Sequence, residues 1–308
     1  MSMVANERTD SPQSRFRVGF VGVLGQTNVG KSTLLNAVLG EKLLITSSKP
    51  QTTRNRIRCV LTTDSWQIVF VDTPGLHRPA NRLGRQLLRE AYRSLRGLTA
   101  LLYVVEPWGS VNDLDREALE RITDFDGPIL LLVNKIDSAS RAAVAETLLA
   151  YEATGRFQEL IPISATRGDG LSDTIDTLVG HLPEREPLFP AGVRFDAQEE
   201  FLVSELIREK AVRLTYREVP YSVAVRVKWF HERDDGLIEI KSELIVERES
   251  QKGILVGKGG QMIRRIGTEA RYDIERLLGK RVFLELIVRV HPNWTRTDGS
   301  IRELTRPG

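Results

Sequence analysis

Hydrophobic and polar positions follow two different patterns along the chain. In the first, short apolar runs typical of buried strands are separated by helical segments. The expected strands are 16–24, 57–62, 66–71, 100–105, 129–133 and 160–163, and helices are expected at 31–39, 83–96, 171–181 and between the later strands. This alternation predicts an α/β domain, with a mostly parallel sheet covered by helices on both faces. The adjacent pair 57–62 and 66–71 is compatible with a local antiparallel hairpin.

The pattern of expected elements changes after residue 182, where closely spaced prolines predict a linker. The elements expected beyond it are a helix at 197–217, strands at 221–230 and 237–247, helices at 250–256 and 261–278, and a strand at 282–290. This α-β-β-α-α-β order predicts a second domain of the α+β class. The expected boundaries are a disordered extension over 1–15, a first domain over 16–182, a linker over 183–196 and a second domain over 197–308.

Composition narrows the class of protein. Of the 308 residues, 41% are hydrophobic and 28% are charged, which suits two globular domains rather than a disordered chain. Because no run of about 18 apolar residues is present, no membrane-spanning helix is expected. The N-terminus lacks the pattern of a secretory signal. Cys59 is the only cysteine, which excludes an internal disulfide and suits a reducing compartment.

The net charge of +3 is distributed unevenly. Residues 248–296 carry 11 lysines and arginines against five acidic residues, a net charge of +6, so the rest of the chain carries −3. A basic surplus near the C-terminus suggests a polyanionic partner, although a solvated basic face has the same composition.

A phosphate-binding motif lies between the first strand and the first helix. The segment from Gly25 to Ser32 fits GxxxxGK[ST] in the strand-to-helix context that this motif requires. Its glycines let backbone amides face a phosphate, Lys31 reaches the β- and γ-phosphates, and the Ser32 hydroxyl ligates Mg²⁺. The predicted nucleotide-binding residues here are Gly25, Gln26, Thr27, Asn28, Val29, Gly30, Lys31, Ser32 and Thr33.

Residues suited to the metal and the terminal phosphate follow the third strand. In Asp72-Thr73-Pro74-Gly75, the carboxylate of Asp72 is expected to hold Mg²⁺ through water, and the N–H of Gly75 is expected to face a γ-phosphate. Thr52 and Thr53 lie in the irregular loop 42–56, where GTPases keep a threonine that closes on Mg²⁺ and the γ-phosphate. Spacing alone does not choose between these two threonines.

The base is predicted to be guanine. Asn134-Lys135-Ile136-Asp137 follows the strand 129–133 and fits NKxD, in which Asp137 accepts from the base N1 and exocyclic amine while Lys135 packs across the ring. Ser164-Ala165-Thr166 follows the next strand and fits the motif whose backbone contacts the guanine oxygen. Adenine presents a reversed pattern, and leaving buried polar groups unpaired discriminates by about 10⁴. All these motifs lie at the carboxyl ends of strands, where parallel sheets bind ligands.

The second domain carries a nucleic-acid motif. Gly257-Lys258-Gly259-Gly260 is a GxxG loop between the last two helices, and its place in the α-β-β-α-α-β order predicts a KH domain of the second topological type. Such a loop lets a nucleic-acid backbone approach closely, with phosphate contacts expected from Lys258, Arg264 and Arg265. The remaining apolar candidates either line the groove or belong to the core; they are Ile254, Leu255, Ile263 and Ile266.

The runs 49–54, 71–79 and 246–260 resemble the Era family of bacterial GTPases, and the similarity extends from about residue 16 to 294. The resemblance implies a P-loop GTPase domain followed by a KH domain, with GTP or GDP and Mg²⁺ as ligands. It implies a GTPase that acts in 30S ribosomal subunit assembly and binds the 3′ end of 16S ribosomal RNA. A monomeric, cytoplasmic protein is expected. Peripheral association with the inner face of the cell membrane is also a property of the family.

The resemblance also bears on single residues. In related GTPases the second threonine of the run at 52–54 meets Mg²⁺, so the predicted metal residues are Ser32, Thr53 and Asp72. The catalytic residues implied are Lys31, Thr53 and Gly75. Two departures are visible: Gln26-Thr27 replaces a common Arg-Pro pair, and Glu106 replaces a common aspartate, without an evident consequence.

Leu76 stands where Ras-like GTPases place a glutamine that orients the attacking water, which predicts slow intrinsic hydrolysis. A lone histidine, His77, follows it and is a weak substitute. Either RNA, the ribosome or another part of the chain supplies the missing group, or a potassium ion bound at Asn28 does so. Asn28 is equally consistent with a purely structural role in the loop.

Two further function classes remain open. One is an RNA-binding assembly factor for which GTP is only an occupancy signal, and the other is a membrane-associated signalling GTPase. A P-loop kinase for a small molecule is disfavoured by the NKxD motif and by the absence of an acceptor-binding domain.

Overall fold

The computed structural model describes residues 16–46, 53–54, 57–79, 81–216 and 218–305. Two predictions lie outside these residues, namely the disordered extension over 1–15 and a metal-binding role for Thr52. Among the helices that are described, none combines the length and the apolar character needed to cross a membrane.

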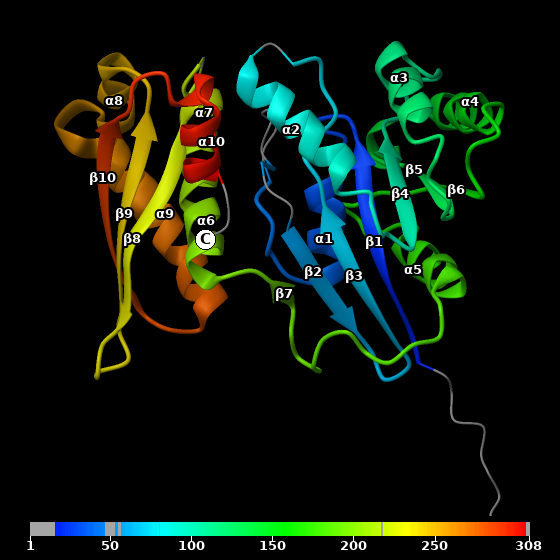
Figure 1. Ribbon diagram of the computed structural model, residues 1–308, viewed down its shortest axis with the longest axis horizontal. Coiled ribbons are helices and arrows are strands. Elements are labelled where there is room, and N and C mark those ends of the chain that lie inside the picture. Colours follow the sequence, from blue (N-terminus) through cyan, green and yellow to red (C-terminus); the bar gives the residue numbers. More distant parts are fainter. Residues whose placement is uncertain (1–15, 47–52, 55–56, 80, 217, 306–308) are drawn as a thin grey trace, which may run out of the picture.

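The first domain is built on a seven-stranded sheet in the order β6-β5-β4-β1-β3-β2-β7 (Figure 1). All pairings are parallel except those that β2 makes with β3 and β7, so the predicted hairpin is confirmed. The strands are β1 Arg17–Gly25, β2 Ile57–Thr62, β3 Trp66–Asp72, β4 Ala100–Val105, β5 Ile129–Val133, β6 Glu159–Pro162 and β7 Phe195–Asp196.

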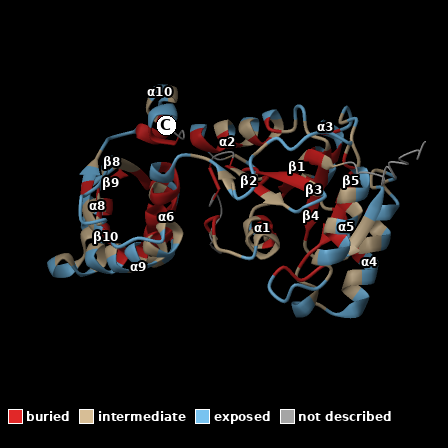
Figure 2. Ribbon diagram, turned by 90° about the horizontal axis from the view of Figure 1, so that it is seen from below, coloured by how far each residue is buried: buried red, intermediate tan, exposed pale blue. Residues whose placement is uncertain are grey.

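Helices cover both faces of this sheet, as the alternation of elements predicts. They are α1 Lys31–Leu39, α2 Arg82–Arg93, α3 Asp113–Arg121, α4 Arg141–Glu152 and α5 Leu171–His181. One buried cluster contains Leu34 of α1 and Leu178 of α5, and the other contains Ala91 of α2, Leu119 of α3 and Tyr151 of α4. The buried residues therefore lie on the strands and on the helix sides that face them, as the colouring of the ribbon in Figure 2 shows.

The second domain pairs a three-stranded sheet, in the order β10-β9-β8, with helices packed on one face. β9 is antiparallel to β8 and parallel to β10. The elements are α6 Glu199–Leu214, α7 Val219–Ser222, β8 Ala224–Glu232, β9 Ile238–Val246, α8 Glu249–Val256, α9 Gln261–Leu278, β10 Val282–Val290 and α10 Asp298–Thr305. The predicted α-β-β-α-α-β order is present, with α7 and α10 in addition.

The predicted linker is bound to the first domain along its course. The N–H of Val18 donates to the carbonyl of Pro183 at 3.0 Å, and that of Val60 donates to the carbonyl of Arg194 at 2.8 Å. The side-chain amide of Gln67 bonds the backbone of Phe189 through both its oxygen and its nitrogen. These bonds bring the chain to β7, which adds a short strand to the edge of the sheet beside β2.

The two domains share an apolar junction. Leu83 and Leu87 of α2 belong to one buried cluster with Trp294 and Ile301 of the second domain. The indole Nε1 of Trp294 donates to the carbonyl of Ser222 at 2.9 Å, which satisfies the ring's polar group inside the cluster. One side of α2 is therefore part of the contact between the domains.

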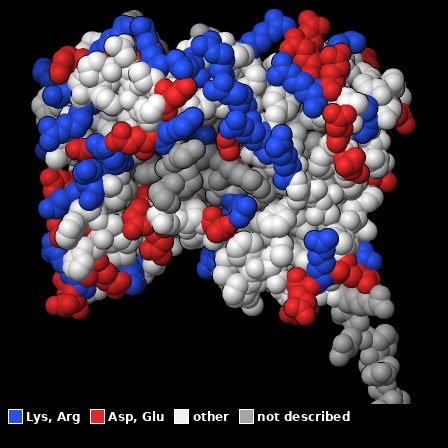
Figure 3. Space-filling view, in the orientation of Figure 1, with Lys and Arg blue, Asp and Glu red and all other residues white. Residues whose placement is uncertain are grey.

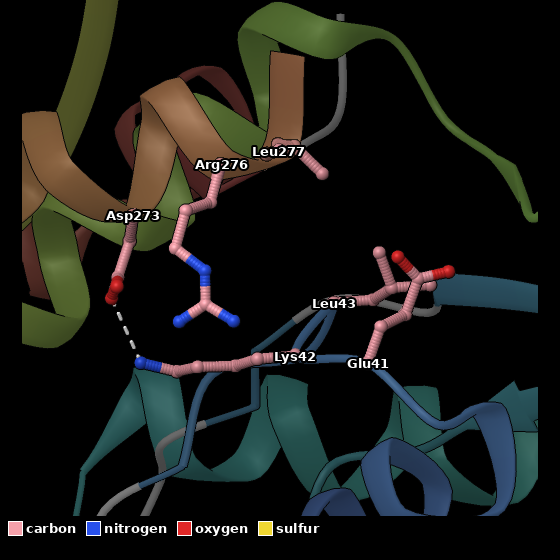
Figure 4. A pocket seen from close by; sticks show the side chains of 6 residues that line it. All are labelled: Glu41, Lys42, Leu43, Asp273, Arg276 and Leu277. Carbon is pink, nitrogen blue, oxygen red and sulfur yellow. Dashed lines mark hydrogen bonds and ion pairs between the residues drawn. The ribbon is translucent and has the colours of Figure 1, made fainter. Parts of the chain in front are cut away.

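A charged contact joins the domains next to the loop after α1. The Nζ of Lys42 lies 2.7 Å from the carboxylate of Glu209. It also lies 2.9 Å from the carboxylate of Asp273, a contact that Figure 4 shows. Lys210 is 2% exposed and pairs with the same two carboxylates. Arg276 points from α9 toward the same loop (Figure 4). The start of the loop that holds Thr53 is thus attached to α6 and α9.

Candidate functional site

The phosphate loop takes its shape from glycines that approach neighbouring strands. A Cβ on Gly25, whose φ is 149°, would lie 2.2 Å from the carbonyl oxygen of Val104. A Cβ on Gly30, whose φ is 101°, would lie 2.3 Å from the Nδ2 of Asn134. Helix α1 begins at the next residue without a side-chain cap. The loop and the helix N-terminus together form an arrangement that favours anions.

Lys31 lies across this loop. Its Nζ donates to the carbonyl oxygens of Gly25 at 3.0 Å and Gln26 at 2.8 Å. Burial lowers the pKa of the Lys31 ammonium to about 8, and the charge of Asp72 opposes that shift. A phosphate next to the buried Lys31 ammonium would stabilise its charged form, because an opposite charge compensates for the loss of hydration.

Three side-chain oxygens converge beside the lysine. The hydroxyls of Ser32 and Thr53 each lie 3.1 Å from the Oδ2 of Asp72, and 3.1 Å from one another. Burial raises the pKa of Asp72 to about 6, against the opposing charge of Lys31. Its Oδ1 is buried without a hydrogen-bond partner among the described residues. A carboxylate and two hydroxyls are hard oxygen donors, so this set fits Mg²⁺.

The segment after Asp72 is bonded to the phosphate loop by its backbone. The N–H of Leu76 donates to the carbonyl of Gly25 at 2.9 Å, and the N–H of Thr27 donates to the carbonyl of Leu76 at 3.1 Å. The Leu76 side chain is fully buried, so it packs rather than faces a nucleotide. The ring Nδ1 of His77 is hydrogen-bonded to the carbonyl of Gly75 at 2.8 Å. His77 is therefore tied to this segment rather than simply solvated.

The NKxD segment connects three loops. The Nδ2 of Asn134 donates to the carbonyl of Val29 at 2.7 Å, while its Oδ1 accepts from the N–H of Ala165 at 3.0 Å. The hydroxyl of Ser164 donates to Asp137 at 2.7 Å. This bond lowers the pKa of Asp137, so its carboxylate stays ionised at neutral pH. The structure thus brings together the predicted phosphate and base motifs.

Glu106 has a consequence that the sequence does not reveal. Its carboxylate lies 2.6 Å from the Nζ of Lys135, and the same Nζ donates to the carbonyl of Asn28 at 2.8 Å. The φ of Lys135 is 67°, so its backbone is left-handed, and the two contacts fix the end of its side chain. Glu106 therefore positions the residue expected to pack across the base.

Gln26 is held by a buried acid on α3. Its Nε2 donates to Asn112 at 2.8 Å and to the Oδ2 of Asp115 at 2.9 Å. Asp115 is 0% exposed and also accepts from the hydroxyls of Tyr103 and Tyr151, each at 2.7 Å. This network joins Gln26 of the phosphate loop to α3, β4 and α4.

A second site lies between α9 and β10. A cavity of about 430 Å³ opens there next to the GxxG loop. Its lining consists of Gly260, Ile263, Arg264, Gly267, Thr268, Arg271, Phe283, Leu284 and Leu286. Phe283 is 49% exposed and gives the groove an aromatic face that the sequence does not single out. The groove combines a cationic rim, an apolar wall and a glycine loop, which suits single-stranded RNA.

The other predicted groove residues divide between core and surface. Leu255 and Ile266 are fully buried in the core of the second domain, whereas Ile254 is 41% exposed and lies outside the cavity lining. Arg265 also lies outside the lining and pairs with Glu269 at 3.0 Å. Of the four apolar candidates, only Ile263 lines the groove.

The GxxG loop itself requires glycine. Gly257, Gly259 and Gly260 have φ values of 70°, 59° and 77°. A Cβ on Gly257 would lie 2.7 Å from the Cβ of Met262, whereas the space around Gly260 is open. Lys258 between them is exposed and available for a phosphate.

Comparison with known proteins adds independent information. Residues 20–135 match the family described as 50S ribosome-binding GTPase, and residues 218–295 match the KH domain. The chain is 46% identical over 291 residues to GTPase Era of Geotalea uraniireducens (strain Rf4), covering 94% of this chain and 98% of the relative. It is 42% identical over 286 residues to GTPase Era of Clostridium kluyveri (strain NBRC 12016), covering 93% and 98%.

Two solved structures are similar over nearly the same span. One is Era in complex with MgGDPNP and nucleotides 1506–1542 of 16S ribosomal RNA, with a TM-score of 0.88, 37% identity, and coverage of 94% of this chain and 98% of that one. The other is a variant of Aquifex aeolicus Era bound to GDP·AlF4⁻, with a TM-score of 0.89, 36% identity, and coverage of 94% and 99%.

Proposed function

The chain belongs to the Era GTPase family, and we propose that it couples GTP binding and hydrolysis to assembly of the small ribosomal subunit. The observation that carries the proposal is the convergence of Ser32, Thr53 and Asp72 beside Lys31, in a chain that also has a KH groove. The proposed domains are residues 16–182 for GTP, 183–196 for the linker and 197–308 for RNA.

The nucleotide phosphates are proposed to bind in the loop from Gly25 to Thr33. Lys31 would turn from the loop carbonyls to the β- and γ-phosphates, and the N–H of Gly75 would meet the γ-phosphate. Ser32, Thr53 and Asp72 would hold Mg²⁺, which neutralises charge between the β- and γ-phosphates when bound. The position of Thr53 at this oxygen cluster supports the choice of Thr53 as the metal-binding threonine.

Guanine is proposed to bind over the NKxD segment. Asp137 would accept from the base through its carboxylate, which Ser164 orients. Asn134 would act as a positioning residue, because both ends of its amide bond neighbouring loops. Lys135 would pack across the base, and the backbone of Ala165 would contact the guanine oxygen.

Hydrolysis is proposed to be slow in the isolated chain. Leu76 is buried and apolar, so it offers no group to orient water. A group from RNA or the ribosome would orient the attacking water, or a potassium ion at the exposed Asn28 would stabilise the charge that develops during hydrolysis. The bond between His77 and Gly75 supports a positioning role for this histidine near the γ-phosphate.

The RNA is proposed to lie in the groove between α9 and β10. The solved relative that holds nucleotides 1506–1542 of 16S ribosomal RNA supports the 3′ end of this RNA as the ligand. Gly257, Lys258, Gly259 and Gly260 would meet the backbone, with Arg264 inside the groove and Arg265 at its margin. Action on the 30S subunit, a monomeric state and a cytoplasmic location with peripheral membrane association belong to the same proposal.

A specific contact favours the alternative in which GTP acts as an occupancy signal. The loop that holds Thr53 is attached to the second domain through Lys42 and through Arg54, which donates to three carbonyl groups there. A nucleotide that moves Thr53 would therefore disturb the RNA-binding half. If RNA affinity changes strongly between GDP and a non-hydrolysable GTP analogue while turnover is negligible, this alternative is favoured.

The test uses the intact chain with labelled GTP, ATP and a single-stranded RNA from the 3′ end of 16S ribosomal RNA. We expect GTP binding with rejection of ATP by about 10⁴ or more, and RNA binding that exceeds binding of a scrambled sequence. Equal competition by ATP would refute the guanine assignment. Equal affinity for the scrambled RNA would refute the RNA assignment.

A further inference from the structure

Helix α3 turns one of its acidic residues inward. Asp113, Glu117 and Glu120 of this helix are exposed, and Figure 3 shows the acidic surface that gathers over α3. Asp115, in the same helix, is instead 0% exposed. A buried carboxylate is costly unless its oxygens are hydrogen-bonded, so the partners of Asp115 indicate what it does. The proposed nucleotide contacts do not involve this side chain.

Among the described residues, four side chains donate to the carboxylate of Asp115. The hydroxyl of Tyr103 donates to Oδ1 at 2.7 Å. The Oδ2 accepts from the hydroxyl of Tyr151 at 2.7 Å and from the amides of Asn112 and Gln26, each at 2.9 Å. Burial and the charge of Asp115 raise the pKa of both tyrosines, so their hydroxyls stay protonated and remain donors. All four bonds point toward the carboxylate, which accepts through both oxygens.

One of these four donors belongs to the phosphate loop. Tyr103 and Tyr151 are fully buried on β4 and α4, and Asn112 is the N-cap of α3. Gln26 comes from the loop, and its Nε2 also donates to the Oδ1 of Asn112 at 2.8 Å. Both hydrogens of this amide are therefore used, and Asn112 and Asp115 hold it at two points. The side chain of Gln26 thus attaches the loop to a fixed point outside it.

The backbone of Gln26 lies between the two groups that are proposed to meet the γ-phosphate. Its carbonyl accepts from the Nζ of Lys31 at 2.8 Å. Gln26 is also the parallel bridge partner of Leu76, the residue after Gly75. A Cβ on Gly75 would lie only 2.8 Å from the Cα of Thr27, so the two segments are in close contact. A shift of the loop at Gln26 would therefore change the spacing between Lys31 and Gly75.

We propose that Asp115 is a positioning residue for GTP hydrolysis, which acts on the reaction by holding Gln26. The inference rests on the proposed function and deepens it, because it adds a residue that touches neither the nucleotide nor the metal. Groups that stabilise developing charge are effective when they are fixed before the reaction begins. A misplacement of about 1 Å can lower a rate by on the order of 10²-fold. The anchor at Asp115 would prevent such a shift of Lys31 relative to Gly75.

Nucleotide binding should depend less on this anchor than hydrolysis does. The far end of the phosphate loop has its own attachment, the bond from the Nδ2 of Asn134 to the carbonyl of Val29 at 2.7 Å. The proposed base contacts lie beside that attachment, at Asp137 and Ala165. Loss of the Gln26 anchor therefore frees only the end of the loop next to Lys31. An interaction that matters mainly in the transition state lowers kcat and leaves KM nearly unchanged.

The test compares two glutamines that each hold one segment to another. Gln26→Ala releases the phosphate loop, whereas the matched control Gln67→Ala releases the linker, which the buried Gln67 amide bonds at Phe189. Gln26→Arg keeps donors for the carboxylate of Asp115. Asp115→Asn is made alone and together with Gln26→Ala. For each intact variant, kcat and KM for GTP, affinity for GDP and the unfolding midpoint are measured.

We expect Gln26→Ala to lower kcat by about tenfold or more, with KM and GDP affinity changed by less than about threefold. The control Gln67→Ala should lower the unfolding midpoint and leave kcat unchanged. Gln26→Arg should retain kcat. The double variant of Gln26 and Asp115 should lose no more kcat than Gln26→Ala alone, because residues that act through one contact are not additive.

Three results would overturn the proposal. They are an unchanged kcat in Gln26→Ala, an equal loss of kcat in Gln67→Ala, and additive losses for Gln26→Ala and Asp115→Asn. If Asp115→Asn does not fold, the comparison of the two alanine variants with Gln26→Arg still decides. A parent chain that does not hydrolyse GTP would instead refute the proposed function.

Discussion

Replacing Arg54 with alanine should loosen the contact between the two domains. Arg54 directly follows Thr53, and its guanidinium donates to the carbonyl oxygens of Val223 at 2.8 Å, Tyr221 at 3.1 Å and Pro220 at 3.2 Å. The residue is 3% exposed. Burial lowers its pKa to about 9, so it remains charged at neutral pH. Arg54→Ala therefore leaves three carbonyl groups without their donor.

The magnitude follows from these contacts. Three hydrogen bonds to a charged group contribute about 1.5 kcal/mol each, or roughly 4–5 kcal/mol together. The guanidinium also lies 5.8 Å from the ring centroid of Trp294, worth about 1 kcal/mol. The desolvation of a buried charge is relieved in the variant and offsets part of the loss. A net destabilisation of about 3–5 kcal/mol is expected, concentrated at the junction.

Urea unfolding, followed by tryptophan fluorescence, measures this effect. We expect the second domain of Arg54→Ala to unfold at lower urea than the first. The matched control is Arg58→Ala, because Arg58 pairs with Asp196 at the surface, where both side chains are more than a third exposed, and should cost less than about 1 kcal/mol. If Arg54→Ala also costs less than about 1 kcal/mol and leaves the midpoint unchanged, the junction does not depend on this residue.

Three other substitutions test the proposed sites. Asp137→Asn should weaken GTP binding by about 10²–10⁴ and admit xanthosine triphosphate, because two charge-assisted bonds are worth about 1.5–3 kcal/mol each; unchanged GTP affinity would contradict the assignment. Gly260→Asp should abolish binding of single-stranded RNA, because it places a negative charge where phosphate approaches, and should spare GTP binding, because the space around the added Cβ is open. Joint loss of RNA and GTP binding would indicate misfolding. Lys258→Ala should lower the slope of log RNA affinity against log salt by about one ion. For Asn28→Ala, any acceleration of GTP turnover by potassium over sodium at equal ionic strength should disappear, and a parent chain indifferent to the cation would exclude potassium activation.

The ends of helices and strands can be predicted from the sequence where a residue at the boundary, such as a glycine, stops the element. Helix α1 spans the predicted residues because glycines with positive φ stand at both of its ends. The helix predicted over 197–217 is wrong at its end, since α6 stops at Leu214 and α7 begins at Val219, next to Pro220. β7 and α10 were not predicted. The two residues of β7 carry no periodicity of their own and form a strand only because β2 lies beside them.

The nucleotide motifs could be found from sequence because each lies at the end of a buried strand. Parallel strands bring those ends together, so order along the chain was sufficient. The supporting contacts could not be found in this way. The bonds of Glu106 to Lys135 and of Gln26 to Asp115 join residues far apart in sequence, and each involves a side chain with no motif of its own. The aromatic wall at Phe283 depends on the packing of α9 against β10.

The attachment of the Thr53 loop to the second domain constrains how nucleotide and RNA can influence each other. Lys42 holds one side of this loop to α6 and α9, and Arg54 holds the other side to the segment before β8. Movement of Thr53 away from the oxygens of Ser32 and Asp72 is therefore coupled to the contacts with the second domain. Either the contacts of Arg54 break, at a cost of about 3–5 kcal/mol, or the second domain moves with the loop. At 1.4 kcal/mol for each factor of ten, contacts of about 3–5 kcal/mol keep the detached state below about 1% of the molecules, so the loop and the second domain are expected to move together.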